Sequence, residues 1–106
     1  MFGLVRFNDG GQSLLGGYSE IREITDDIEE MVLQFDDEII SFLEGIYDSD
    51  DVDYNLVGYS VLVVAGFNYA IIFTPIIDAQ QLDVSYQIII YEPIFSNLSL
   101  TTIELI

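Results

Sequence analysis

Carboxylates are the main side chains in this sequence that could do chemistry. The chain has 106 residues, with 19 Asp and Glu against 2 Lys and Arg, and it has no His and no Cys. Acids that could be paired for acid–base catalysis occur at positions 26–27, 29–30 and 36–38. A catalytic carboxylic acid needs partial burial to raise its pKa, and acids on the solvent face of a helix are not buried. We therefore interpret these acids as a solvated face and predict that the chain is not an enzyme.

A second candidate is the acidic run at positions 48–53, which reads Asp-Ser-Asp-Asp-Val-Asp. Carboxylates at alternate positions can converge on a hard cation such as Ca²⁺. Counted from Asp48, however, Asp53 and Tyr59 stand where an EF-hand loop needs Gly and Glu. We interpret the run as a solvated loop, with a weak cation site as the alternative, and we predict no cofactor.

The absence of His and Cys excludes several kinds of site. Structural zinc sites use these residues, most nucleophilic triads use a His base, and thiol enzymes need a Cys. No disulfide can form, so cysteine usage does not indicate a redox compartment. The formal net charge of −17 argues against binding to nucleic acid or to an anionic membrane surface, because both require basic side chains.

Membrane insertion and secretion are not predicted. The N-terminus lacks a long apolar segment followed by a cleavage site, so we expect no signal peptide and a cytoplasmic protein, with a secreted location as the alternative. The uncharged stretch 54–77 is long enough to cross a bilayer, but polar residues and Pro75 interrupt it. Its β-branched and aromatic residues favour strands.

The elements that position these residues fall into an acidic half and a neutral half. Residues 20–53 hold 14 of the 19 acids, and their apolar residues recur every three or four positions. This spacing predicts one long amphipathic helix over 19–46, with Ser19 as its N-cap. Residues 54–106 read as strands at 54–64, 67–77, 82–91 and 98–106, whose short connections predict an antiparallel meander.

The expected architecture is α+β. We predict one domain over 1–106, in which a long helix packs across a four- to five-stranded antiparallel sheet. Residues 1–18 form an N-terminal arm, and the apolar piece 2–7 could supply the fifth strand.

A short motif in the neutral half adds a family resemblance. Residues 62–69 read Leu-Val-Val-Ala-Gly-Phe-Asn-Tyr, which alone predicts a hairpin corner. Placed after a long helix, Val-Val-Ala-Gly-x-Asn-Tyr resembles the cystatin superfamily of cysteine-protease inhibitors, and most closely its stefin (type 1 cystatin) branch. Gly10 and Gly11 resemble the family's N-terminal glycine trunk, nine residues ahead of the predicted helix start. Glu92 and Pro93 stand where stefins carry a Leu-Pro turn. The resemblance covers about residues 10–106.

The resemblance implies a cystatin-like fold and reversible, competitive inhibition of papain-like cysteine proteases. In the family, the glycine trunk and two hairpin loops form a wedge that fills the active-site cleft of the protease. Carried over by position, the implied protease-binding residues are Gly10, Gly11, Leu62, Val63, Val64, Ala65, Gly66, Glu92, Pro93 and Ile94. Phe95 offers further apolar contact at the second loop. Leu62 stands where the family motif usually begins with Gln, and a second doublet at 16–17 leaves the register of the trunk open.

Self-assembly is the alternative function, from a different class. Residues 84–91 form an uncharged, β-prone stretch, which is typical of strand addition, and the family is known for domain swapping. A homo-oligomer joined through edge strands or the N-terminal arm would use this property, although the net charge opposes it at low salt. Three explanations of the acidity stay open: halophilic adaptation, a basic partner surface and an engineered sequence.

Overall fold

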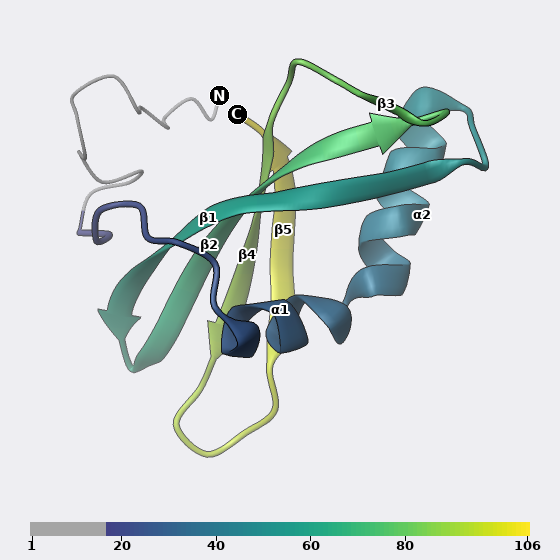
Figure 1. The fold of residues 1–106 in the computed structure, drawn as a ribbon. Helices are drawn as coiled ribbons and strands as arrows, with labels where there is room; N and C mark the ends of the chain where they lie inside the picture. The colour runs from purple at the N-terminus through teal and green to yellow at the C-terminus, as the bar shows by residue number, and fades with distance from the viewer. Residues whose placement is uncertain (1–16) are drawn as a thin grey trace.

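The computed structural model describes residues 17–106 (Figure 1). The predictions for the strand at 2–7 and for Gly10 and Gly11 lie outside the described residues. The helices are α1 (Asp26–Leu33) and α2 (Asp36–Tyr47). The strands are β1 (Val52–Val64), β2 (Gly66–Ile77), β3 (Gln80–Gln81), β4 (Tyr86–Glu92) and β5 (Ser99–Leu105).

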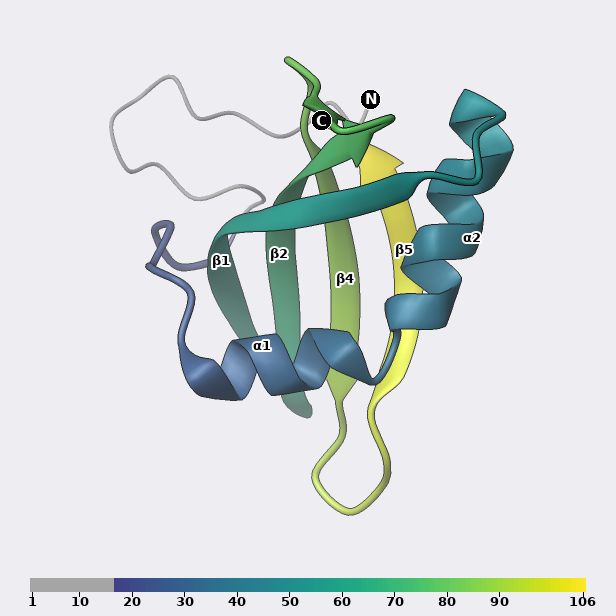
Figure 2. The same cartoon turned by 45° about the vertical axis from the view of Figure 1, so that its right-hand side comes forward.

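The strands form an antiparallel sheet in the order β1-β2-β4-β5, with the short β3 paired to β2. The predicted meander is therefore confirmed, because each long strand pairs with the next long one along the chain. A single residue, Ala65, separates β1 from β2, and this tight turn forces the two strands to run side by side from Val64 and Gly66 to Val52 and Ile77. Figure 2 shows β1 curving strongly along its length, and a register irregularity between Leu56 and Gly58 lies within it.

The predicted helix over 19–46 begins too early. Ser19 is not an N-cap: its N–H donates to the Val61 carbonyl at 2.8 Å, and Arg22 forms a β-bridge with Tyr59. These residues therefore run beside β1 in extended conformation. Helix α1 begins only after Thr25, whose hydroxyl accepts a hydrogen bond from the Ile28 N–H at 3.3 Å.

The predicted helix is also broken in two. Helix α1 ends at Leu33, Gln34 and Phe35 form a turn, and α2 starts at Asp36. In Figure 2, α1 lies across the strands, whereas α2 runs more nearly along β5. The two helices bury Ile28, Val32, Ile39 and Leu43 in one cluster. A straight helix follows one direction only, and the bend lets both apolar stripes reach a sheet that curves.

The core fills both faces of the central strands. Ile71, Phe73, Ile88 and Ile90 pack beneath the helices, whereas Ala70, Ile72 and Ile89 form a second cluster with Tyr18 on the other side. Successive strand residues point to opposite faces, so these continuous apolar runs place side chains in both clusters. Complete burial of an aliphatic side chain contributes about 1.5–3 kcal/mol to stability, so the side chains of β2 and β4 contribute much of the stability of the fold.

No helix within residues 17–106 is long and apolar enough to span a membrane.

Candidate functional site

The β1–β2 hairpin turn is held against the end of β4. Gly66 has φ +115°, a conformation that L side chains rarely adopt. A Cβ atom there would overlap the Glu92 carbonyl oxygen and would lie 3.0 Å from Pro93 Cα. Gly66 is therefore required because the backbones of the two segments touch. The fold itself thus needs a glycine at position 66, whether or not a partner binds.

The β4–β5 loop lies next to this hairpin. Phe67 is paired with Glu92 in the β2–β4 register, and the Tyr91 hydroxyl donates a hydrogen bond to the Ala65 carbonyl at 2.5 Å. Figure 1 shows both connections at the same end of the sheet, the hairpin at lower left and the longer loop at the bottom. The structure thus brings together the two loop segments that the sequence suggested, with contacts that fix one against the other.

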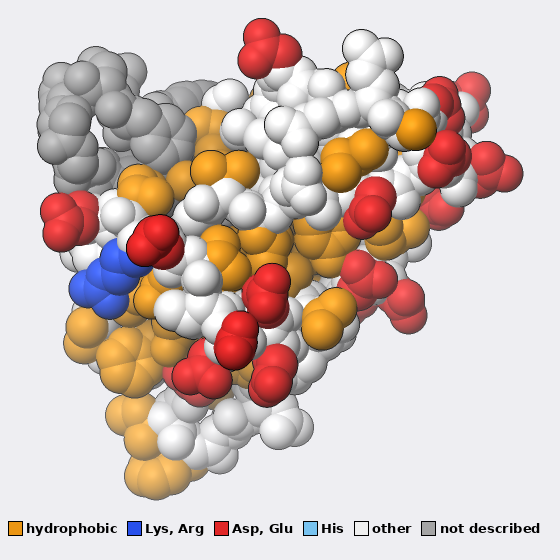
Figure 3. Space-filling view, viewed as in Figure 1, with side chains coloured by type: hydrophobic (Ala, Val, Ile, Leu, Met, Phe, Trp, Pro, Cys, Tyr) orange, Lys and Arg blue, Asp and Glu red, His pale blue; other side chains and the backbone are white. Residues whose placement is uncertain are grey.

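The two loops expose a group of apolar side chains, which we call the apolar edge. Its members are Val63, Val64, Phe67, Ile94 and Phe95. Val63 is 72% exposed and Phe95 is 95% exposed. Figure 3 shows orange side chains at lower left and at the lower tip, whereas the red acids lie over the rest of this face, many of them above the helices. Large apolar side chains gathered at loop tips are typical of a protein-binding surface.

Glu92 is the only charged residue in the loop segments 62–66 and 92–94, and its side chain is hydrogen-bonded within the protein. Its Oε1 accepts a hydrogen bond from the Tyr69 hydroxyl at 3.0 Å. Burial, this hydrogen bond and the nearby carboxylate charge raise the pKa of Tyr69 to about 12. Because the carboxylate is half-buried and partnered, Glu92 supports the second loop, and the exposed surface of the apolar edge is formed by its neighbours.

The N-terminal segment approaches the same hairpin. Gly17 has φ +89°, and a Cβ atom there would lie 2.9 Å from Leu62 Cδ1. Tyr18 is buried against Ala70 and Ile72, and Leu62 packs on this cluster. Leu62 is therefore half-buried beneath the hairpin, whereas Val63 and Val64 next to it are exposed.

Eight of the ten predicted protease-binding residues lie within the described part of the chain. Residues 62–66 and 92–94 lie together at one end of the sheet, and Gly10 and Gly11 lie outside the described residues. Sequence reasoning missed Phe67 as a member of the apolar edge and Tyr91 as the link between the loops. No sequence signal marks them, because their roles depend on the pairing of β2 with β4.

The acidic candidates are spread over the helices and the loop that follows them. Ser49 in this loop donates a hydrogen bond to Asp78 at 2.7 Å, and Asp48 closes α2 in the left-handed conformation. Among residues 17–106, no group of three or more His, Cys, Asp or Glu side chains is placed to hold a metal ion. The connection between α2 and β1 is shorter than the loop predicted over 48–53, because Val52 and Asp53 already belong to β1.

Comparison with known proteins adds one structural likeness. No family model matches this sequence, and no curated protein matches it. A solved structure, the secreted type 1 cystatin from Fasciola hepatica, matches with a TM-score of 0.63 and 24% sequence identity. The match covers 87% of this chain and 97% of that chain. It shows that the chain has the fold of a type 1 cystatin, so the predicted cystatin-like α+β fold is confirmed. Two details are wrong: two short helices replace the single long helix, and the strand predicted over 82–91 begins at Tyr86.

Proposed function

We propose that this protein is a reversible, competitive inhibitor of papain-like cysteine proteases, and that its apolar edge enters the active-site cleft. The observation that carries the proposal is the contact between the two loops, which presents Val63, Val64, Phe67, Ile94 and Phe95 together at one end of the sheet. The fold supports it, because the solved structure that matches is named a type 1 cystatin.

The geometry suits binding without chemistry. The hairpin turn has only one residue between its strands, and the Tyr91 hydrogen bond ties it to the second loop. Loops that are already ordered lose little conformational entropy on association, which favours tight binding. The exposed members of the apolar edge carry no charge, so a partner's cleft removes no ion from water when it closes over them. A chain without cysteine is expected to act in reducing and oxidising compartments alike.

We place the glycine trunk at Gly16 and Gly17. Gly10 lies nine residues ahead of Ser19, the residue predicted to cap the helix. Thr25 is the cap in the structure, and the glycine nine residues ahead of it is Gly16. Its neighbour Gly17 lies against Leu62 at the hairpin, which supports the same register.

The decisive test is a titration of active papain with the purified protein, read as residual hydrolysis of a small peptide substrate. Tight inhibition with a dissociation constant around nanomolar, on the order of −12 kcal/mol, is expected. Inhibition that is overcome by excess substrate establishes the competitive mode. The absence of inhibition at tens of micromolar refutes papain-type inhibition.

A matched pair of variants tests the surface. Val63→Asp places a charge in the apolar edge, and Val57→Asp places the same charge on an exposed valine of the same strand, outside the edge. We expect Val63→Asp to weaken inhibition about 100-fold, which corresponds to roughly 2.8 kcal/mol, and Val57→Asp to change it less than about twofold. Equal losses in both variants refute the assignment. The register of the trunk is tested by Gly17→Glu against Gly11→Glu, of which only the first is expected to reduce inhibition.

A further inference from the structure

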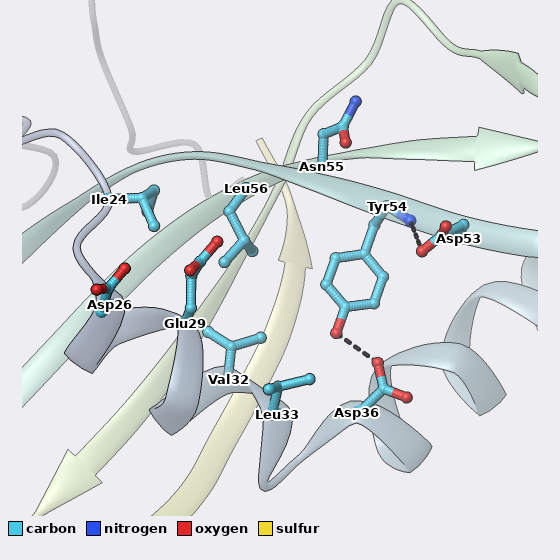
Figure 4. A pocket seen from close by; sticks show the side chains of 10 residues that line it. All are labelled: Ile24, Asp26, Glu29, Val32, Leu33, Asp36, Asp53, Tyr54, Asn55 and Leu56. Carbon is cyan, nitrogen blue, oxygen red and sulfur yellow. Dashed lines mark hydrogen bonds between the residues drawn. The ribbon is translucent and has the colours of Figure 1, made fainter.

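The break between α1 and α2 opens a groove against β1. Its volume is about 640 Å³, and side chains of α1, of the start of α2 and of β1 line it (Figure 4). The predicted straight helix would contain no such bend at Gln34 and Phe35. The groove is therefore a consequence of the fold, and it shares no lining residue with the apolar edge.

The floor of the groove is aliphatic. Val32 is buried beneath it, whereas Leu33, the last residue of α1, is 65% exposed at its edge. Leu56 faces them from β1, as Figure 4 shows. An aliphatic chain laid along this floor would cover apolar surface that now faces water, which favours binding.

The rim of the groove carries four carboxylates, those of Asp26, Glu29, Asp36 and Asp53. Asp36 accepts a hydrogen bond from the Tyr54 hydroxyl at 2.6 Å, and Asp53 accepts one from the Tyr54 N–H at 2.8 Å. Within residues 17–106, no hydrogen bond or ion pair reaches the side chains of Asp26 and Glu29. Figure 4 shows Glu29 extending from α1 toward Leu56, over the floor.

No basic side chain lines this groove. Arg22, the one basic residue within the described range, is bridged to Tyr59 further along β1 and does not contribute to the lining. The four carboxylates repel one another, and no basic side chain among the described residues lies in the groove to offset this repulsion. A cation bound between them would relieve this repulsion.

We propose that the groove docks a partner protein through an arginine side chain on an exposed segment. The aliphatic stem of arginine would lie on Leu33 and Leu56, and its planar guanidinium would lie between Asp26 and Glu29. Arginine combines these two parts, because its stem can be buried while its head remains charged and donates two parallel hydrogen bonds to a carboxylate. This interaction is separate from protease inhibition, and it gives the acidity of the chain a basic partner.

The binding experiment uses the ¹⁵N-labelled full chain and the capped peptide Leu-Arg-Leu-Arg, followed by NMR in 0.15 M NaCl. We expect saturable chemical-shift changes centred on α1, the turn at 34–35 and residues 53–56 of β1. The same peptide with citrulline in place of arginine keeps the shape and removes the charge, and it should bind at least tenfold more weakly. Shifts spread evenly over all acidic surfaces, or equal binding of the citrulline peptide, overturn the proposal.

Two double variants separate the groove from bulk charge. Asp26→Asn with Glu29→Gln removes two charges from the rim, and Asp27→Asn with Glu30→Gln removes the same two residue types from the exposed side of the same helix. We expect the first pair to weaken peptide binding at least tenfold and the second less than twofold. Equal effects overturn the proposal. Leu33→Ala, at a position that is 65% exposed, should weaken binding severalfold, and unchanged binding in this variant also overturns the proposal.

Discussion

Gly66→Ala is expected to destabilise the protein more than any other single methyl addition at a described glycine. The new Cβ would overlap the Glu92 carbonyl oxygen, which belongs to the backbone of β4 and cannot rotate away. The alanine would also have to adopt φ near +115° or force the hairpin to change shape. Gly45→Ala is the matched control, because it lies within α2 and a Cβ there would meet no atom within 4 Å.

The magnitude follows from two costs. A non-glycine residue held in a sparsely populated backbone region costs about 1–3 kcal/mol, and forcing extra volume into a packed contact costs about 1–3 kcal/mol. The free energy of unfolding should therefore fall by about 2–6 kcal/mol, which is a large part of the 5–15 kcal/mol typical of a domain. Gly45→Ala should raise it by about 0.5–1 kcal/mol, because alanine is the better helix former.

Urea unfolding followed by circular dichroism measures both effects. With a slope of about 1.5 kcal/mol per molar urea, the midpoint for Gly66→Ala should fall by about 1–4 M, whereas that for Gly45→Ala should rise slightly. Inhibition of papain should weaken as well, because the clash separates the two loops. A midpoint for Gly66→Ala equal to that of the parent protein would refute the close contact between the hairpin and β4, and with it the loop geometry on which the proposed function depends.

Three further predictions concern the core, the helix cap and the alkaline range. Leu43→Ala, at a fully buried position, should lower the free energy of unfolding by about 2–5 kcal/mol in the same urea assay. Thr25→Ala should lower it by about 0.5–1 kcal/mol, and no change would show that α1 does not start there. The pKa of Tyr69 is about 12 in the folded state against 10.0 ordinarily, so the folded state holds this proton more tightly. Its contribution to stability is complete below pH 10 and is lost as the pH rises toward 12, so a Tyr69→Phe variant should show a shallower decline in stability than the parent protein over this range.

The strands could be predicted because their signals are local. Turn-forming residues interrupt the β-branched and aromatic runs where one strand gives way to the next. They are Gly66, the Asp78–Ala79 turn and Pro93. Short connections then leave little choice except antiparallel pairing of neighbours. The motif at 62–69 added the fold, because its residues and their place after the helical segment resemble a known family. The same resemblance suggested the loop residues of the candidate site, and residues 62–66 and 92–94 lie together in the structure.

The start and the break of the helical segment could not be predicted, because the spacing of its apolar residues is the same on both sides of each. The apolar residues Ile24, Ile28, Val32, Phe35 and Ile39 continue the same spacing through both the start of α1 and the break at Gln34 and Phe35. Residues 19–22 carry apolar and acidic side chains that suit a helix, but their backbone groups are taken up by Tyr59 and Val61 of β1. Propensity is a weak preference that such tertiary contacts override.

The amino-acid sequence was thus enough to predict the class of the fold, the order of the strands and the sharp division between an acidic half and a neutral one. These depend on periodicity, turn residues and composition, which act over a few neighbouring positions. The folded structure was needed to show where the helical segment starts and bends, that the Tyr91 hydroxyl ties the hairpin to the second loop, and that four acids from α1, α2 and β1 surround an apolar groove. Such features arise when segments distant in the chain come into contact, and the curvature of the sheet sets which residues meet.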